Sequence, residues 1–176
     1  LGIPVEEAFF GQRMATALPK ADLIIGNNVY AHVPDINDFT HGLREALKPD
    51  GVVTLEFPHI VRLVDACQFD TVYHEHFSYL SLLSVEKVFE ASDLRVFHVE
   101  SLSTHGGSIR VYGCHVDSSI AEKQSVEDIR CDEATRGLHT SAYYQDFQAR
   151  ADAAKNGFLR FLLAAKAAGE SVAGYG

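Results

Sequence analysis

The order of apolar segments between residues 21 and 60 constrains the fold of this chain most. Residues 23–25 (LII) and 52–60 (VVTLEFPHI) are continuous apolar runs, which are typical of strands buried on both faces of a parallel sheet. Between them, apolar residues recur at spacings of three and four from Ile36 to Leu47 and predict a helix, with Asp35 as its N-cap and the turn KPDG at 48–51 as its end. A strand, a helix and a second strand in this order predict a βαβ unit with a right-handed crossover.

The next segments predict a hairpin beside this unit. Residues 84–94 have the pattern of a short helix that starts near Ser84. Residues 94–102 and 108–116 alternate between apolar and polar positions, and only STHGG separates them. Two such runs joined by a glycine-containing loop of this length predict an antiparallel pair.

The last part of the chain predicts helices. Residues 120–168 are rich in Ala, Glu, Gln, Lys and Arg. We expect two helices here, with a break near Gly137 and an end at Gly169, since glycine commonly follows the last turn of a helix.

The charge and the cysteines narrow the classes of partner. The chain has 176 residues, 15 Lys and Arg against 24 Asp and Glu, and a formal net charge of -9. This balance argues against nucleic acid or an anionic membrane as partner and favours a small-molecule substrate. Three widely spaced cysteines without a CxxC pair indicate reduced thiols and a cytoplasmic protein, and we identify neither a signal peptide nor a membrane-spanning run.

One segment concentrates groups that carry protons. DTVYHEHFSYLS at 70–81 places Tyr73, His74, Glu75 and His76 in consecutive positions. If the segment is extended, Tyr73 and Glu75 share one face and the two histidines share the other. A helical turn would instead bring Tyr73 and His76 together. The sequence leaves both conformations open.

Four strings of residues resemble a known family. They are NNVYAHVPD, DGVVTLEFPH, FDTVYHEHFSYLS and THGGSIRVYGCH. Together they resemble the sugar C-methyltransferases, which use S-adenosylmethionine to methylate a carbon of a nucleotide-linked keto-deoxysugar. The resemblance implies an α/β fold: the C-terminal half of a class I (Rossmann-like) methyltransferase sheet with a terminal antiparallel hairpin, followed by a helical segment.

The resemblance also implies a division of the chain. The family layout is a cysteine-rich zinc-binding segment, a methyltransferase domain and a C-terminal α/β domain. We expect residues 1–118 to be the last part of the methyltransferase domain, 119–169 a helical linker, and 170–176 the start of the C-terminal domain. A start at Leu1 and an end in SVAGYG suggest a piece of a longer protein. Without a glycine-rich cofactor loop, such a piece is expected to be inactive alone.

Methyl transfer to carbon requires a base that removes a proton next to a ketone. By resemblance, the catalytic residues are His32, Tyr73, Glu75 and His76. We expect His76 to be the base and Glu75 to orient it, with Tyr73 and His32 contacting the ketone or hydroxyls of the sugar. His74 is interpreted as a surface histidine or one that supports the site from behind.

The resemblance extends to residues that bind the two substrates. The cofactor-binding candidates are Asn27, Asn28 and Val29. The substrate-binding candidates are Phe57, His59, His105, Gly106 and Gly107. On spacing alone, the asparagines fit a strand-end turn equally well, Phe57 fits a packing side chain, and the HGG string fits a hairpin turn.

Two alternatives remain open at this point. His74, Glu75 and His76 with His32, His59 or His105 could supply two histidines and a carboxylate for a divalent metal. The chain could also be a folded, non-catalytic part of a larger enzyme, with its helical end used for interdomain or dimer contacts.

Overall fold

The computed structural model describes residues 2 and 4–175, and the chain forms two compact units, 1–136 and 137–176. The strands are β1 Ala21–Asn27, β2 Leu47–Pro58, β3 Leu94–Leu102 and β4 Ser108–His115. The helices are α1 Gln12–Ala15, α2 Ile36–Ala46, α3 Ile60–Asp65, α4 Leu82–Glu90, α5 Gln124–Arg136 and α6 Phe147–Ala167.

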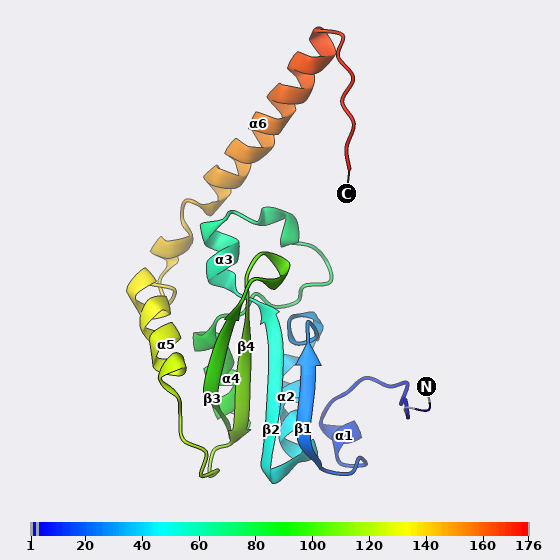
Figure 1. Ribbon diagram of the computed structural model, residues 1–176, viewed down its shortest axis with the longest axis vertical. Coiled ribbons are helices and arrows are strands. Elements are labelled where there is room, and N and C mark those ends of the chain that lie inside the picture. The colour runs from blue at the N-terminus through cyan, green and yellow to red at the C-terminus, as the bar shows by residue number, and fades with distance from the viewer. Residues whose placement is uncertain (1, 3, 176) are drawn as a thin grey trace. The chain divides into compact units, whose positions relative to one another are not determined.

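The first unit contains a four-stranded sheet in the order β1-β2-β4-β3 (Figure 1). β1 and β2 pair in parallel, with Leu23 opposite Val52 and Asn27 opposite Glu56. β4 pairs antiparallel with both β2 and β3. The βαβ unit and the hairpin predicted from the sequence are therefore both confirmed, and the fold class is α/β.

Helix starts follow local side-chain chemistry. The carboxylate of Asp35 accepts hydrogen bonds from the backbone N–H groups of Asn37 and Asp38, as predicted for an N-cap. The predicted start of the next long helix near Ser84 is wrong. α4 begins after Ser81, whose side chain accepts from the Ser84 N–H while the Ser84 hydroxyl accepts from the Ser81 N–H. Ser84 is therefore the third helical residue of a capping box.

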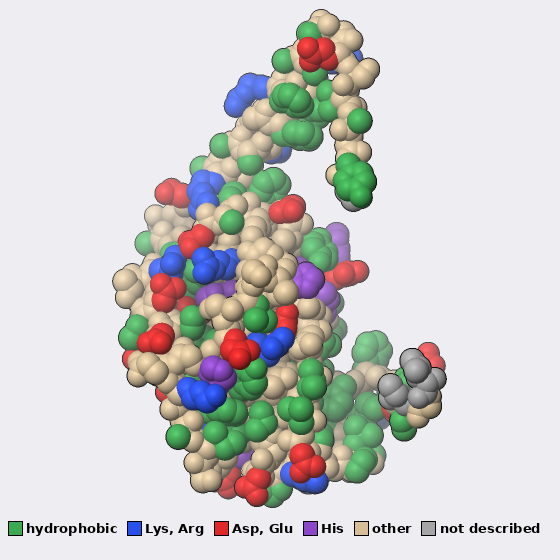
Figure 2. All heavy atoms as spheres, in the orientation of Figure 1, with side chains coloured by type: hydrophobic (Ala, Val, Ile, Leu, Met, Phe, Trp, Pro, Cys, Tyr) green, Lys and Arg blue, Asp and Glu red, His purple; other side chains and the backbone are tan. Residues whose placement is uncertain are grey.

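The core lies on one face of the sheet. α2 and α4 pack behind the sheet in Figure 1 and bury a cluster that includes Leu43, Leu55, Phe89 and Val111. The prediction that β1 is buried on both faces is wrong, because Leu23 and Ile25 are 53% and 63% exposed. The opposite face turns toward the viewer in Figure 2, where hydrophobic side chains lie next to charged ones.

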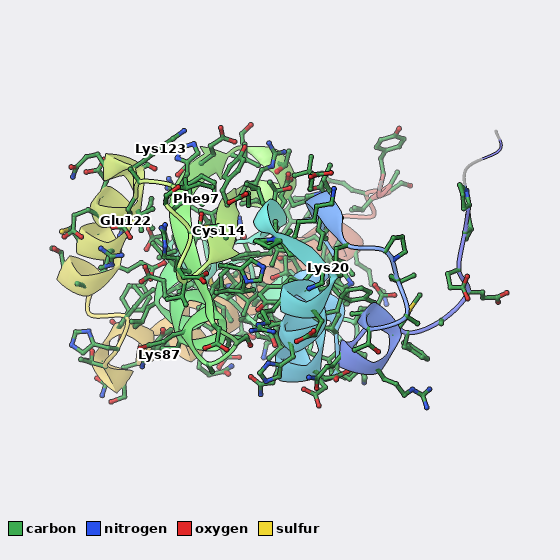
Figure 3. The ribbon with its side chains drawn as sticks, turned by 90° about the horizontal axis from the view of Figure 1, so that it is seen from below. Lys20, Lys87, Phe97, Cys114, Glu122 and Lys123 are labelled. Atoms are coloured by element: carbon green, nitrogen blue, oxygen red, sulfur yellow. The ribbon has the colours of Figure 1, made fainter. Side chains whose placement is uncertain are left out.

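α5 belongs to the first unit. It lies along β3, at the edge of the sheet away from α1 and α2 (Figure 3). The Lys123 N–H donates to the carbonyl of Phe97 over 2.8 Å and ties the start of this helix to the strand. The first of the two predicted helices thus packs on the sheet.

The second unit contains α6, a helix of 21 residues. Gly137 precedes it and Gly169 follows it, both with positive φ, so the predicted break and end are confirmed. Phe158, Phe161 and Leu163 on this helix are each more than half exposed. No helix among the described residues is long and apolar enough to cross a membrane.

Candidate active site

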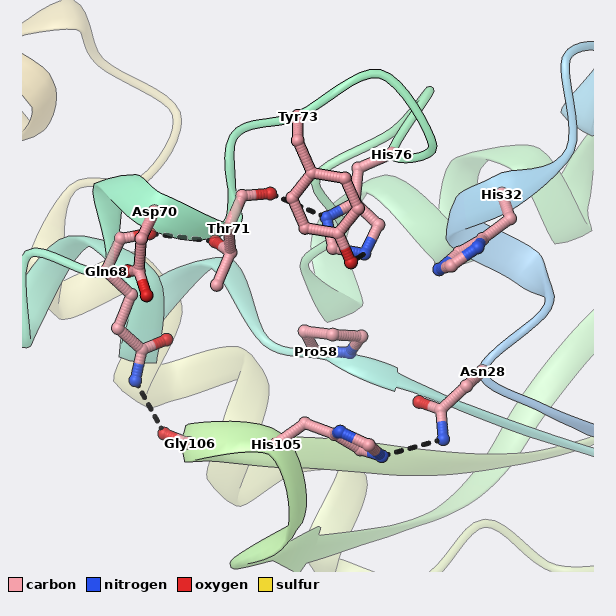
Figure 4. Close-up of a pocket in the computed structure, with 10 residues that line it drawn as sticks. All are labelled: Asn28, His32, Pro58, Gln68, Asp70, Thr71, Tyr73, His76, His105 and Gly106. Atoms are coloured by element: carbon pink, nitrogen blue, oxygen red, sulfur yellow. Dashed lines mark hydrogen bonds between the residues drawn. The ribbon is translucent and has the colours of Figure 1, made fainter. Parts of the chain in front are cut away.

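A cleft of about 440 Å³ opens at the carboxyl ends of β1 and β2. Open α/β sheets bind their ligands at this edge, outside the carboxyl ends of parallel strands. The tip of the β3–β4 hairpin closes one side, and the loop between α3 and α4 closes another (Figure 4). The residues that line the cleft are Asn28, His32, Pro58, Gln68, Asp70, Thr71, Tyr73, His76, His105 and Gly106.

The loop from residue 66 to 81 is folded by its own hydrogen bonds. The Gln68 N–H donates to Leu63 O over 2.9 Å, and the Thr71 hydroxyl donates to Gln68 O over 2.8 Å. The His76 N–H donates to Tyr73 O over 3.1 Å, which closes a turn. Of the two conformations that the sequence left open, the structure contains the turn that brings Tyr73 and His76 together.

The same loop is fastened beside the end of β1. The N–H groups of Phe77 and Ser78 both donate to Ala31 O, over 2.9 and 3.1 Å. This contact places His76 next to His32, with ring centroids 4.8 Å apart in an edge-to-face arrangement. Two segments more than forty positions apart in the sequence therefore meet as one cluster of imidazoles (Figure 4).

His76 has different partners at its two ring nitrogens. Nδ1 lies 2.7 Å from the main-chain oxygen of Thr71, and Nε2 lies 3.3 Å from the hydroxyl of Tyr73. A carbonyl oxygen only accepts hydrogen bonds, so Nδ1 carries the proton in the neutral ring. Nε2 is then the basic nitrogen. It lies next to the hydroxyl of Tyr73, and both residues line the cleft.

The expected orienting residue, Glu75, does not hold His76. Glu75 is exposed and does not line the cleft, whereas the carbonyl of Thr71 contacts the imidazole directly. The turn explains the difference, because it directs Tyr73 and His76 to one side and leaves the two residues between them, His74 and Glu75, on the outside.

Asn28 and His105 form the opposite wall. Asn28 Nδ2 donates to His105 Nε2 over 3.1 Å. Both residues have positive φ, 53° and 51°, a region that few non-glycine residues occupy, and such conformations cluster at functional sites. The Gln68 side chain donates to Gly106 O over 2.9 Å and fixes the hairpin tip against the loop.

Several predicted residues lie elsewhere. Phe57 is fully buried and packs near Tyr30, with ring centroids 6.1 Å apart, so the packing interpretation of this residue holds. Asn27 lies on the open face of the sheet with Leu23 and Ile25. Val29 packs against the core, and Gly107 accepts from the His59 N–H without lining the cleft.

His59 is buried away from the cleft and paired with Glu133. Its Nε2 lies 2.7 Å from Glu133 Oε1. The same carboxylate accepts the N–H groups of Leu82 and Leu83 over 2.7 and 2.8 Å, so it also caps the start of α4. Glu133 is 2% exposed, and no local signal in the sequence marked it.

Besides Pro58, three polar lining residues were not predicted: Gln68, Asp70 and Thr71. Asp70 and Thr71 open the quoted string DTVYHEHFSYLS and Gln68 lies two positions before it, so a search for polar residues at the start of that string would have found them. Among the described residues, no group of three His, Cys, Asp or Glu is arranged to hold a metal ion. The three cysteines are free.

Comparison with known proteins gives matches along almost the whole chain. Residues 4–99 match the family model of a methyltransferase domain, and residues 103–176 match that of a C-methyltransferase C-terminal domain. The chain is 35% identical over 166 residues to the C-methyltransferase NovU of Streptomyces niveus. The aligned region covers 94% of this chain and 40% of that protein, so the chain spans about two fifths of its relative's length.

Solved structures are more distant. The magnesium protoporphyrin IX methyltransferase of Synechocystis PCC 6803, with SAH bound, has a TM-score of 0.46 at 13% identity over 58% of this chain and 48% of that one. The PH0226 protein of Pyrococcus horikoshii OT3 has a TM-score of 0.45 at 13% identity over 62% of this chain and 55% of that one.

Proposed function

This chain belongs to the methyltransferase family, in its C-methyltransferase branch, and on that premise we propose that its cleft removes a proton from the carbon next to a ketone of a nucleotide-linked deoxysugar so that this carbon can be methylated. The observation that carries the proposal is the pair of contacts to His76. They leave a basic imidazole nitrogen beside a phenol in a cleft at the carboxyl edge of the sheet.

His76 has the properties of a general base. An imidazole titrates near neutral pH, which suits it to take a proton under physiological conditions. The Thr71 carbonyl fixes the proton on Nδ1 and accepts a stronger hydrogen bond once the ring becomes positively charged. The same contact therefore sets the tautomer of the free site and stabilises the product of proton abstraction.

Tyr73 supports a second role, the stabilisation of the enolate oxygen. In the neutral site its hydroxyl donates to His76 Nε2 over 3.3 Å, a long contact for a hydrogen bond. When Nε2 takes the substrate proton it becomes a donor itself, and the phenolic hydrogen is released to turn toward the developing oxyanion. His32, whose ring meets that of His76 edge-to-face, is close enough to contact the same substrate.

S-adenosylmethionine, when bound, supplies the methyl group on a positively charged sulfur. The lining fits this end of the cofactor: it contains the Asp70 carboxylate, imidazole rings and a phenol, and no Lys or Arg among its described residues. Aromatic faces and carboxylates attract a cation, whereas Lys or Arg would repel it. Asn28, at the end of β1, would hold the cofactor on the wall opposite His76.

The same lining favours a neutral, hydroxyl-rich acceptor. Its volume is within the roughly 300–1,000 Å³ of small-molecule sites, and its amide, hydroxyl and imidazole groups exchange hydrogen bonds with sugar hydroxyls. A diphosphate would lack a cationic partner among these residues. We therefore place the sugar ring inside the cleft and the nucleotide outside it.

A substrate panel tests the proposal. The full-length protein is incubated with S-adenosylmethionine and nucleotide-linked 4-keto-deoxysugars, with the same sugars reduced to 4-hydroxy compounds as controls. We expect NMR to detect a new methyl group on a carbon next to the ketone, only in the keto sugars. Methylation of an oxygen, or equal methylation of the reduced sugars, would contradict the proposal.

A further inference from the structure

A buried carboxylate on β2 connects the two halves of the wall opposite His76. Glu56 is 5% exposed, although it lies two residues before the cleft residue Pro58. Burying a carboxylate is costly unless it is paired and hydrogen-bonded, so its place in a strand requires partners.

Those partners reach both residues of the wall. Glu56 Oε1 accepts the Thr104 hydroxyl over 3.0 Å, and Thr104 directly precedes His105. The main-chain oxygen of Glu56 accepts the Asn28 N–H over 2.8 Å. Glu56 therefore contacts Asn28 through its main chain and, through its carboxylate, the side chain of the residue before His105.

The charge of Glu56 is balanced across the sheet. Arg110 lies opposite Glu56 in the β2–β4 register, and its guanidinium donates to Glu56 Oε2 over 2.7 Å. Arg110 also meets Glu100, its register partner on β3, at 3.4 Å. The carboxylate of Glu56 is thus held by Arg110 on one oxygen and is available to Thr104 on the other.

We propose that Glu56 is a positioning residue: its main-chain oxygen holds Asn28, and its carboxylate, through Thr104, holds His105 in its left-handed backbone conformation, so that it shapes the wall that faces the proton-transfer pair. The effect of Glu56 on catalysis rests on the proposed function. Its effect on the conformation of the wall rests on the contacts alone. Both residues of the wall adopt backbone conformations that cost energy, and such conformations persist only where the surroundings impose them.

The first test observes His105 directly in this chain. Asn28 Nδ2 is a donor, so neutral His105 carries its proton on Nδ1, and the ring ¹⁵N shifts report that tautomer. A His105→Asn variant assigns the signals. The variants are Glu56→Gln, which removes the charge, and Thr104→Val, which removes the link while preserving shape. Thr104→Ser retains the hydroxyl and should keep the hydrogen bond to Glu56.

Glu100→Gln is the matched control. It removes another carboxylate partner of the same Arg110, but Glu100 contacts neither Thr104 nor Asn28. We expect Glu56→Gln and Thr104→Val to shift the His105 tautomer equilibrium, and Glu100→Gln and Thr104→Ser to leave it unchanged. If Glu56→Gln fails to fold by circular dichroism, Thr104→Val decides alone. Unchanged His105 signals in folded Thr104→Val would overturn the inference.

The second readout is methyl transfer by the full-length protein. We expect kcat/KM to fall roughly 10- to 100-fold in Glu56→Gln and Thr104→Val, because small displacements of positioning groups cost this much, and to remain near wild type in Glu100→Gln. A normal kcat/KM in a variant whose His105 signals have shifted would overturn the catalytic part. Absence of methylation by the wild-type protein would contradict the proposed function and leave the His105 measurement to decide the positioning role.

Discussion

The imidazole of His76 is held by a main-chain carbonyl: its Nδ1 lies 2.7 Å from the oxygen of Thr71. An acceptor that cannot be protonated or replaced by a side-chain substitution fixes which nitrogen is basic. The orientation of the proposed base therefore depends on the fold of the loop rather than on a neighbouring carboxylate. His76, Tyr73 and Glu75 are therefore expected to contribute differently to the reaction.

Substitution of the proposed base should be far more damaging than substitution of its acidic neighbour. We expect His76→Gln to lower turnover by roughly 10²–10⁴-fold, the range of a lost acid–base group. Tyr73→Phe should lower turnover to a smaller extent, because it removes only the hydroxyl beside Nε2. Glu75→Gln should keep a rate close to wild type, since Glu75 is exposed and lies outside the cleft. Steady-state kinetics of the full-length protein checks all three. A loss in Glu75→Gln as large as that in His76→Gln would restore Glu75 as the orienting residue.

Removal of Glu133 should destabilise the first unit strongly. Its carboxylate satisfies two N–H groups at the start of α4 and the ring of His59, all in a buried setting. Breaking a buried pair of this kind costs about 3–5 kcal/mol. Glu133→Ala should therefore lower the urea midpoint markedly. Asp132→Ala, on the same helix, removes an exposed contact to Arg136 and should change the midpoint little. Equal effects would show that the Glu133 contacts do not stabilise the fold.

Two glycines should respond to alanine in opposite directions. A Cβ at Gly113 in β4 would lie 2.4 Å from Phe89 Cε2 and 3.0 Å from Val53 Cγ1, so Gly113→Ala should destabilise the first unit by about 1–3 kcal/mol. A Cβ at Gly157, inside α6, meets nothing within 4 Å. Gly157→Ala should raise the stability of that helix by about 0.5–1 kcal/mol. Denaturation followed by circular dichroism checks both, and a neutral Gly113→Ala would contradict the packing of β4 on α4.

Alkaline pH should destabilise the protein partly through Tyr30. Burial raises the pKa of the Tyr30 phenol, and the hydrogen bond to Thr40 offsets this only in part. In the unfolded chain the phenol ionises near pH 10, while in the fold it stays protonated. The stability contributed by this group is complete below pH ~10 and is lost as the pH rises further.

The urea midpoint measured from pH 8 to 11 checks this. Tyr30→Phe should flatten the alkaline decline, whereas Tyr175→Phe, at a fully exposed position, should not. Identical declines in wild type and Tyr30→Phe would contradict the assignment.

Local patterns predicted the elements well, and contacts between distant segments account for what they missed. The apolar runs of β1 and β2, the spacing within α2 and the STHGG loop are short-range signals, and each predicted the correct type of element, although β2 starts earlier than predicted, at Leu47. The exposure of Leu23 and Ile25 depends on what covers the sheet, which their own sequence does not encode.

The same distinction between local patterns and long-range contacts applies to the candidate site. The resemblance selected His32, Tyr73, His76, Asn28 and His105, which the structure brings to one cleft. It did not predict the Thr71 carbonyl, because a main-chain group leaves no mark on residue type. His59, directly after β2, was expected to bind the substrate, but its ring contacts Glu133, 74 positions away. A contact between residues so far apart in the sequence leaves no pattern in the residues around either of them.

Hydrogen exchange at the substrate carbon tests the central claim most directly, because it isolates proton abstraction from methyl transfer. A nucleotide-linked 4-keto-deoxysugar is incubated in D₂O with the full-length protein and the demethylated cofactor, and ¹H NMR follows the carbon next to the ketone. We expect this position to exchange with solvent in the wild type and in Glu75→Gln, and exchange to be lost in His76→Gln. Exchange that persists unchanged in a folded His76→Gln variant would contradict the assignment of His76 as the base.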